Sequence, residues 1–272
     1  MMRSLWTAAS GMYAQQLSMD NISNNISNVN TTGYKATNLE FKDLLYSNLT
    51  EAVLNDEGKG SPVTLQVGHG VRTGAISRDF STGNITETGN TFDFAIQGEG
   101  FFCVQDSAGL ERYTKDGTFK ISPFEGTNYL CTSEGYRVLN EDGEPISFDS
   151  TILSSSITVD DEGNFSYKDT ETGEIVGLDQ NFKIVQFTNV LGLESLGENL
   201  YQTTDASGEA ITEEEIDTLS RSTIRQSCIE ASNVQIAEEM VNMIVTQRAY
   251  ELNSKAIQTS DDMLSIANQL KR

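Results

Sequence analysis

Residues 232–272 read SNVQIAEEMVNMIVTQRAYELNSKAIQTSDDMLSIANQLKR, a stretch without proline whose apolar residues recur every three or four positions. This spacing places the apolar side chains on one face of an α-helix. Ser232 and Gln235 fit a capping box, and Glu238 and Glu239 follow where the helix dipole favours acidic side chains. The sequence therefore predicts one helix over 232–272, about 60 Å long at ~1.5 Å per residue.

The apolar face of this helix repeats with a heptad period. One seam runs through the first turns, and a second seam, displaced by one residue, continues to the end with Thr259 in its polar gap. The apolar positions are Val234, Ala237, Val241, Ile244, Val245, Ala249, Leu252, Ala256, Met263, Ile266 and Leu270.

The N-terminal end mirrors this pattern. Ser4 is a candidate N-cap, and the run NVNTTG at 28–33 supplies stop signals, which predicts a helix over 4–28. Gln15 is the one polar position in its heptad stripe. The apolar positions are Leu5, Ala8, Met12, Met19, Ile22, Ile26 and Val29.

Amphipathic helices usually pack on the core of their own domain. A helix of about 60 Å cannot lie wholly against a domain of ~200 residues, whose radius of gyration is ~16 Å. We therefore expect the two terminal helices to form a coiled-coil-like pair and the remaining apolar surface to bind other copies. Asn24, Asn25 and Asn28 crowd the end of the first helix, where a frayed terminus or polar contacts with neighbouring helices would each explain them.

Between the helices, short apolar runs alternate with turn dipeptides such as Asp116-Gly117, Glu134-Gly135, Asp142-Gly143 and Glu162-Gly163. This pattern is typical of antiparallel β-structure. The expected strands cover 63–67, 74–78, 92–96, 101–105, 118–121, 129–132, 136–139, 157–159, 164–167 and 182–188, and polar connections are expected at 47–61 and 203–220. The predicted fold class is mixed α and β, with long terminal helices and an antiparallel β-rich centre.

The charge distribution restricts the possible partners. The chain has a formal net charge of −22, and residues 31–231 hold 13 basic and 34 acidic residues, or −21. Such a surface repels nucleic-acid phosphates and anionic lipid, so we expect no nucleic-acid partner and no lipid insertion. No run approaches the ~18 apolar residues of a membrane span. Composition alone therefore favours a cytoplasmic protein.

Residues that could carry out chemistry are few. The one histidine, His69, lies between glycines, which favours a turn residue over a catalytic base. Residues 160–171 are spaced like a calcium loop, but Phe165 stands where the central glycine is required. Cys103, Cys131 and Cys228 are far apart, as expected for buried residues or free thiols. We therefore expect no catalytic, cofactor-binding or metal-binding residue and no enzymatic activity.

Several motifs, in a fixed order, resemble the bacterial flagellar rod, hook and hook-associated protein family. The run NNISNVNTTGYK at 24–35 is similar to the N-terminal signature of that family. The other matching segments are SLWTAASGM (4–12), FKDLLY (41–46), GHGVR (68–72), GEGFF (98–102), YTKDGTF (113–119), ENLY (198–201), EASN (230–233) and AEEMVN (237–242). Residues 47–67 match in length a spacer that is typical of the distal rod branch, and proximal rod or hook subunits are the alternative.

The resemblance implies a structural subunit in the flagellar basal body. It would polymerise into a helical tube that transmits torque from motor to hook and encloses the export channel. The implied parts are an N-terminal inner helix (1–30), a linking region (31–90) with the spacer (47–67), a β-rich outer domain (91–190), a returning link (191–231) and a C-terminal inner helix (232–272).

The same resemblance implies the partners. These are further copies of the chain, other rod and hook subunits, and the type III export apparatus, with outer bushing rings and peptidoglycan as further candidates. The 21 residues expected at the subunit interface are the apolar positions given above together with Asn24, Asn25 and Asn28. The more distant alternative is an acidic periplasmic β-rich binding module or glycan-active enzyme.

Overall fold

The computed structural model describes residues 2–50, 65–124, 126–150, 152–168, 175–213 and 221–270. Its contacts divide the chain into two units. The helical unit comprises Met1–Ser27, Thr37–Arg78 and Gln235–Arg272, and the β-rich unit comprises Asn28–Ala36 and Asp79–Val234. The predicted division into inner and outer layers concerns an assembly and stays a prediction.

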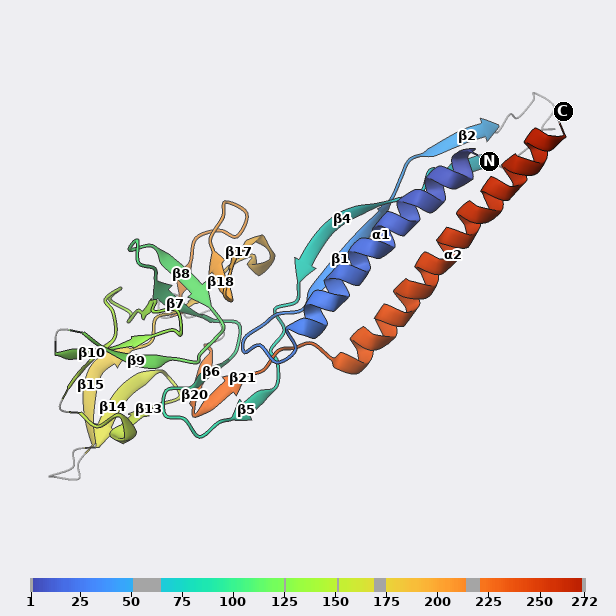
Figure 1. Ribbon diagram of the computed structural model, residues 1–272. Coiled ribbons are helices and arrows are strands. Elements are labelled where there is room, and N and C mark those ends of the chain that lie inside the picture. The colour runs from blue at the N-terminus through green and yellow to red at the C-terminus, as the bar shows by residue number, and fades with distance from the viewer. Residues whose placement is uncertain are drawn as a thin grey trace. The chain divides into compact units, whose positions relative to one another are not determined.

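Two long helices dominate the helical unit, as predicted. Helix α1 spans Met2–Ser27 and helix α2 spans Ile236–Gln269. They lie side by side and run in opposite directions (Figure 1), and hydrogen bonds connect Ser4 to Ser260 and Asn25 to Glu239. None of the helices in the described part of the chain combines the length and apolar composition needed to cross a bilayer.

Both predicted helix starts are wrong in detail. Ser4 lies inside α1, two residues beyond its first residue. The capping box at α2 does not form, because Gln235 is the N-cap and makes no side-chain capping hydrogen bond. Ser232 instead accepts a hydrogen bond from the backbone N–H of Val234, ahead of the helix. Glu238 and Glu239 do occupy the first turn of α2, as predicted.

Two pairs of antiparallel strands complete the helical unit. Strand β1 (Thr37–Asp43) pairs with β4 (Val71–Arg78), and β2 (Tyr46–Thr50) pairs with β3 (Leu65–Gly68). The start of the predicted polar connection at 47–61 is therefore a strand. Residues 51–64, which form most of the spacer at 47–67, lie outside the described residues.

The β-rich unit is built from antiparallel strand pairs, as predicted. Its largest sheet has ten strands, ordered β12-β10-β11-β7-β8-β18-β17, with β16, β19 and β9 attached at its sides. A sheet of three strands, β13-β14-β15, and the pairs β20-β6 and β21-β5 complete it. The strand bounds are β5 Ile85–Glu87, β6 Phe94–Gln97, β7 Phe101–Gln105, β8 Glu111–Thr114, β9 Lys120–Phe124, β10 Thr127–Cys131, β11 Arg137–Val138, β12 Ser147–Asp149, β13 Ile157–Val159, β14 Asn164–Lys168, β15 Ile175–Asn181, β16 Ile184–Gln186, β17 Glu194–Gly197, β18 Leu200–Gln202, β19 Ile211–Thr212, β20 Thr223–Gln226 and β21 Cys228–Glu230.

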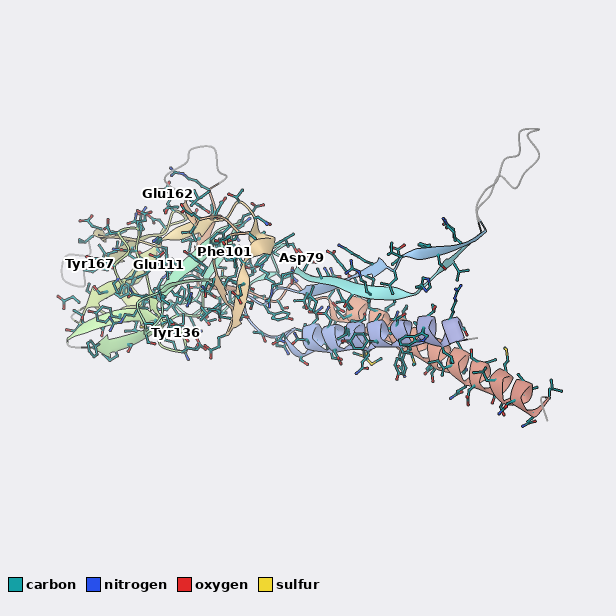
Figure 2. All side chains as sticks on the ribbon, turned by 90° about the horizontal axis from the view of Figure 1, so that it is seen from above. Asp79, Phe101, Glu111, Tyr136, Glu162 and Tyr167 are labelled. Carbon is teal, nitrogen blue, oxygen red and sulfur yellow. The ribbon has the colours of Figure 1, made fainter. Side chains whose placement is uncertain are left out.

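Strand β7 connects two hydrophobic clusters because its side chains alternate between the faces of the sheet. Phe102 and Val104 belong to the larger cluster, and Phe101 and Cys103 belong to the smaller one. Both clusters lie in the β-rich unit. Phe101, a member of the smaller cluster, is labelled in Figure 2. Aromatic rings pack edge to face through them, for example Phe94 on Phe182 with ring centroids 4.9 Å apart.

Candidate assembly surface and buried polar cluster

The predicted apolar stripe of α2 is exposed over most of its length. Val241 is 59% exposed, Leu252 66% and Ile266 59%. The same outward stripe includes Ile244, Val245, Met263 and Leu270, together with Ala237 and Ala256, which are also exposed, and half-buried Ala249. Val234 is buried, but it precedes α2 and belongs to the β-rich unit. The expectation that this stripe pairs with α1 is wrong, because its side chains are left open to solvent.

The predicted stripe of α1 is largely covered. Ala8 and Ile22 are buried. Leu5, Met12, Met19 and Ile26 are half-buried. Val29 is also half-buried but lies beyond the end of α1, in the β-rich unit. The two stripes therefore differ, because the apolar side chains of α1 are mostly shielded from solvent and those of α2 are mostly exposed.

Small and polar residues make several close contacts between α1 and α2. The hydroxyl oxygens of Ser4 and Ser260 lie 3.3 Å apart. The Asn253 amide lies against Gly11, where a β-carbon would come within 2.9 Å of its nitrogen. Thr246 and Ser260 are the buried residues of α2. Sequence reasoning missed this seam because it searched for apolar positions only.

Asn25 connects three elements of the helical unit. Its side-chain N–H groups donate to the carbonyl oxygen of Thr37 and to Oε1 of Glu239, both at 2.9 Å. Its Oδ1 accepts from the backbone N–H of Thr37 at 3.0 Å. Asn25 is only 1% exposed, so these bonds are shielded from water. Within the chain, Asn25 therefore makes a polar contact between the two helices, and its expected place at a subunit interface stays a prediction.

The other two predicted asparagines differ from Asn25. Asn24 is exposed on α1, and Asn28 lies just beyond the helix end. Asn28 accepts hydrogen bonds from the backbone N–H and the hydroxyl of Thr31, in the manner of a helix terminus. Both expectations for the asparagine cluster therefore apply, each to a different residue.

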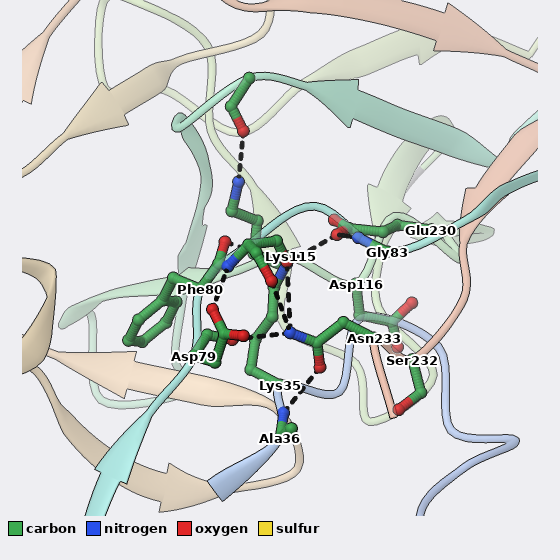
Figure 3. Close-up of polar contacts among 12 residues, drawn as sticks. Lys35, Ala36, Asp79, Phe80, Gly83, Lys115, Asp116, Glu230, Ser232 and Asn233 are labelled. Carbon is green, nitrogen blue, oxygen red and sulfur yellow. Dashed lines mark hydrogen bonds and ion pairs between the residues drawn. The ribbon is translucent and has the colours of Figure 1, made fainter. Parts of the chain in front are cut away.

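A buried polar cluster, formed by fully buried Lys35, Lys115 and Glu230 with half-buried Asn233 at its edge, lies within the β-rich unit (Figure 3). The Lys35 ammonium lies 2.6 Å from Oε1 of Glu230, and both side chains are 1% exposed. Lys35 also donates to the carbonyl oxygen of Ser81 at 2.8 Å. Oε1 of Glu230 accepts a second bond, from the backbone N–H of Gly83 at 2.7 Å, whereas its Oε2 is buried without a hydrogen-bond partner.

Asn233 extends this cluster along the backbone. Its Oδ1 accepts from the N–H of Ala36 at 2.7 Å, and its side-chain amide donates to the carbonyl oxygen of Asp79 at 2.9 Å. Ala36, Asp79 and Val234 are three of the four residues at which the chain enters or leaves the β-rich unit. The Asn233 side chain and the neighbouring Lys35–Glu230 ion pair therefore hold the backbone in place at these three residues.

Lys115 is the second buried ammonium of the cluster. It donates to the carbonyl oxygen of Gly98 at 2.9 Å and lies 4.9 Å from the centre of the Phe101 ring. Burial, together with the nearby positive charge of Lys35, lowers its pKa to about 8. Sequence reasoning quoted Lys35, Lys115, Glu230 and Asn233 within family-like motifs but gave none of them a role.

The residues considered for chemistry lie apart from these features. His69 is exposed in the two-residue connection between β3 and β4, which forms no turn, so its expected place in a turn is not confirmed. The turn at Asp160 and Gly163 closes the hairpin of β13 and β14, and Glu171 lies outside the described residues. Across the described part of the chain, no group of three His, Cys, Asp or Glu residues is placed to hold a metal ion. Cys103 and Cys131 are buried free thiols, and Cys228 is half-buried.

Comparison with known proteins identifies relatives along the whole chain. A flagella basal body rod protein model matches residues 5–35, a flagellar hook protein FlgE/F/G D1 domain model matches residues 95–167, and a flagellar basal body rod FlgEFG protein C-terminal model matches residues 225–270. The chain is 46% identical to flagellar basal-body rod protein FlgG of Borreliella burgdorferi, with 100% of each chain covered. Flagellar basal-body rod protein FlgG of Buchnera aphidicola subsp. Acyrthosiphon pisum is 41% identical over 99% of this chain and 100% of its own, and that of Bacillus subtilis is 36% identical over 100% of both. Because relatives this similar align with all of it, the chain belongs to the flagellar basal-body rod protein family.

Proposed function

We propose that this protein is the structural subunit of the distal rod of the bacterial flagellum. It resides in the basal body, where copies polymerise into a helical tube that transmits torque from motor to hook and encloses the export channel. Full-length relatives named flagellar basal-body rod protein FlgG support this assignment. Other rod and hook subunits adjoin it at the two ends of the tube, as family membership implies.

The exposed stripe of α2 is the observation on which the assembly mechanism depends. Leu252, Ile266 and Val241 are each more than half exposed on a helix of 34 residues. Both hydrophobic clusters among the described residues lie in the β-rich unit, so the helices have no comparable core of their own. A contiguous apolar stripe of this kind marks an interaction site. A second copy of the chain covers it, through a heterologous contact that repeats to form a helical filament.

The remaining roles follow from charge and from the helix pair. The helices form a coiled-coil-like inner layer, and the β-rich unit lies outside, where most of the −22 net charge costs least. The chain reaches this place through the type III export apparatus, and rings or peptidoglycan contact its outer surface. It works as a mechanical element, without an enzymatic activity.

A pair of matched substitutions on α2 tests the assembly role. Val241→Asp places a charge on the apolar stripe, whereas Gln247→Asp places the same charge on the face that carries Ser254, Asp261 and Asn268. Both sites are exposed in the single chain, so neither change disturbs its fold. We expect Val241→Asp to abolish swimming and rod formation, because a charge buried in an interface without a partner costs several kcal/mol. Gln247→Asp retains both.

Cryo-electron microscopy of isolated basal bodies and swimming in soft agar give the two measurements. Rods of normal length in the Val241→Asp strain would overturn the proposal that this stripe joins the copies. Failure of both variants would mean that any added charge on α2 is harmful, and would remove the support that the stripe gives to the proposal.

A further inference from the structure

Three polar contacts between α1 and α2 are spaced at multiples of seven residues on both helices. Ser4 meets Ser260, Gly11 meets Asn253, and Asn25 meets Glu239. Ser18 and Thr246, which complete the two series, line one cavity of about 240 Å³ together with Asn25 and Glu239. Moving seven residues forward along α1 corresponds to moving seven residues backward along α2. This is the pattern expected when two antiparallel helices pack in a single register.

Each contact in this series involves small or polar groups. They are a pair of hydroxyls, an amide on a glycine, and an amide donating to a carboxylate. We call Ser4, Gly11, Ser18 and Asn25 with Ser260, Asn253, Thr246 and Glu239 the polar ladder. Apolar contacts are non-directional, so a purely apolar seam would tolerate a shift by one heptad. Hydrogen bonds and a close fit of side-chain shapes are lost when the helices shift by one heptad.

Gly11 and Asn253 are the most selective contact of the polar ladder. Gly11 is the one glycine of α1, and it leaves the room that the Asn253 amide fills. A shift of seven residues would move Asn253 onto Ser4 or Ser18, where a β-carbon and hydroxyl occupy that room. The same shift would separate Asn25 from Glu239.

We propose that the polar ladder determines the register of α1 against α2 and so fixes where the outward apolar stripe of α2 is presented to the next copy. This inference rests on the proposed function. A heptad shift would displace the stripe by about 10 Å along the helix, at ~1.5 Å per residue. Copies with shifted helices would present their stripes at the wrong height and would not add to the tube. The polar ladder is thus a set of positioning residues for assembly.

Exchange of the two residues of the selective contact tests this role. Gly11→Asn alone places a second amide where Asn253 already lies, and Asn253→Gly alone leaves an empty space. The double variant Gly11→Asn/Asn253→Gly restores one amide facing one glycine. We expect Gly11→Asn to reduce the number of rods per cell at least tenfold and the double variant to recover to within about twofold of wild type. A role limited to helix propensity predicts a different order, in which Gly11→Asn is no worse than wild type and Asn253→Gly is the worst variant, since Asn is a better helix former than Gly.

The register itself is measured by an engineered disulfide in the full-length chain with Cys228→Ser. Ser4→Cys/Ser260→Cys reports the native register, because those hydroxyls are 3.3 Å apart. Ser4→Cys/Ala267→Cys reports a shift by one heptad and lies out of disulfide reach in the native register. The shifted disulfide should be absent with the native ladder, form in Gly11→Asn, and disappear again in the double variant.

Three outcomes separate the possibilities. Recovery of rods together with the native disulfide supports the proposal. A double variant that recovers neither the native disulfide nor the rods, or a native disulfide unaffected by Gly11→Asn, overturns it. If the disulfides follow the expected pattern while rod number does not change in any variant, the register role stands and the proposed link to assembly fails.

Discussion

Removing the Lys35 ammonium tests whether the buried polar cluster stabilises the β-rich unit. In Lys35→Met, Glu230 stays buried with the Gly83 N–H as its remaining donor, and the carbonyl oxygen of Ser81 loses a donor. Breaking a fully buried ion pair from one side costs about 3–5 kcal/mol. Lys115 lies near enough to interact with Glu230 and compensates part of this charge, so we expect the lower end, about 3 kcal/mol.

Urea unfolding followed by far-UV circular dichroism measures this loss. With an m-value of about 2 kcal/mol/M, a loss of 3 kcal/mol lowers the midpoint by roughly 1.5 M. Lys183→Met is the matched control, because Lys183 and Glu111 form an ion pair at 2.9 Å whose side chains are 16% and 42% exposed. An exposed pair contributes at most about 1 kcal/mol.

A double substitution distinguishes charge from packing. Lys35→Met/Glu230→Leu removes both charges, and replacing a buried pair with apolar residues is close to neutral in other proteins. We expect the double variant to regain at least half of the loss. If Lys35→Met lowers the midpoint no more than Lys183→Met does, the claim that this pair supports the unit is refuted.

Lys115 should make the stability of the β-rich unit depend on pH. Its pKa is about 8 in the fold and 10.5 ordinarily, so the unfolded chain binds the proton more tightly between these two values. The free energy of unfolding therefore rises from pH 8 to 10.5. The expected rise in the free energy of unfolding is about 3 kcal/mol. It is measured by urea unfolding as the difference between wild type and Lys115→Met, because burial also raises the pKa of Cys103 and Tyr113, which lowers the stability of both proteins over the upper part of that range. Parallel curves of stability against pH for the two proteins would contradict this prediction. Limited proteolysis of the dilute chain should leave a core of roughly residues 28–234, which contains the β-rich unit with Lys35 and Glu230, since the helices lack a hydrophobic cluster of their own. Protection of both ends would count against assembly-dependent ordering. Deleting residues 47–67 should leave tubes that assemble but curve under electron microscopy. Ser47 pairs with Val67, so the segment returns to its starting point and can reach at most ~35 Å, which is still enough to brace neighbouring copies. Straight tubes would move the source of stiffness to the β-rich unit.

Local patterns in the sequence were enough to predict the elements. The heptad spacing between Leu5 and Ile26 and the proline-free stretch after 232 predicted α1 and α2, because a helix depends on neighbours three and four residues away. Strands β7 and β13 were predicted to the residue, since apolar runs beside turn signals mark them. Strands such as β8 and β20 were missed because their residues are mostly polar and become strands by pairing with distant partners.

Which face of each helix is covered could not be predicted from periodicity. On α2, two heptad series run in parallel, one through Leu252 and Ile266 and one through Thr246 and Ser260. Hydrophobicity alone selected the first series for pairing, whereas the fold buries the second, because α1 offers a glycine and hydroxyls at matching height. A heptad pattern determines that a face exists, and only the partner determines which face is used.

The buried polar cluster depends wholly on the tertiary structure. Lys35 and Glu230 are 195 residues apart, and each alone would be assigned to a solvated surface by its charge. Burial of either residue is tolerable because the fold supplies the other, together with the N–H of Gly83 and the carbonyl of Ser81. The sequence by itself determined the helices, the β-rich centre and the family; the tertiary structure decided which charges are paired, which helix face is free and in what register the helices meet, because all three depend on contacts between residues far apart in the chain.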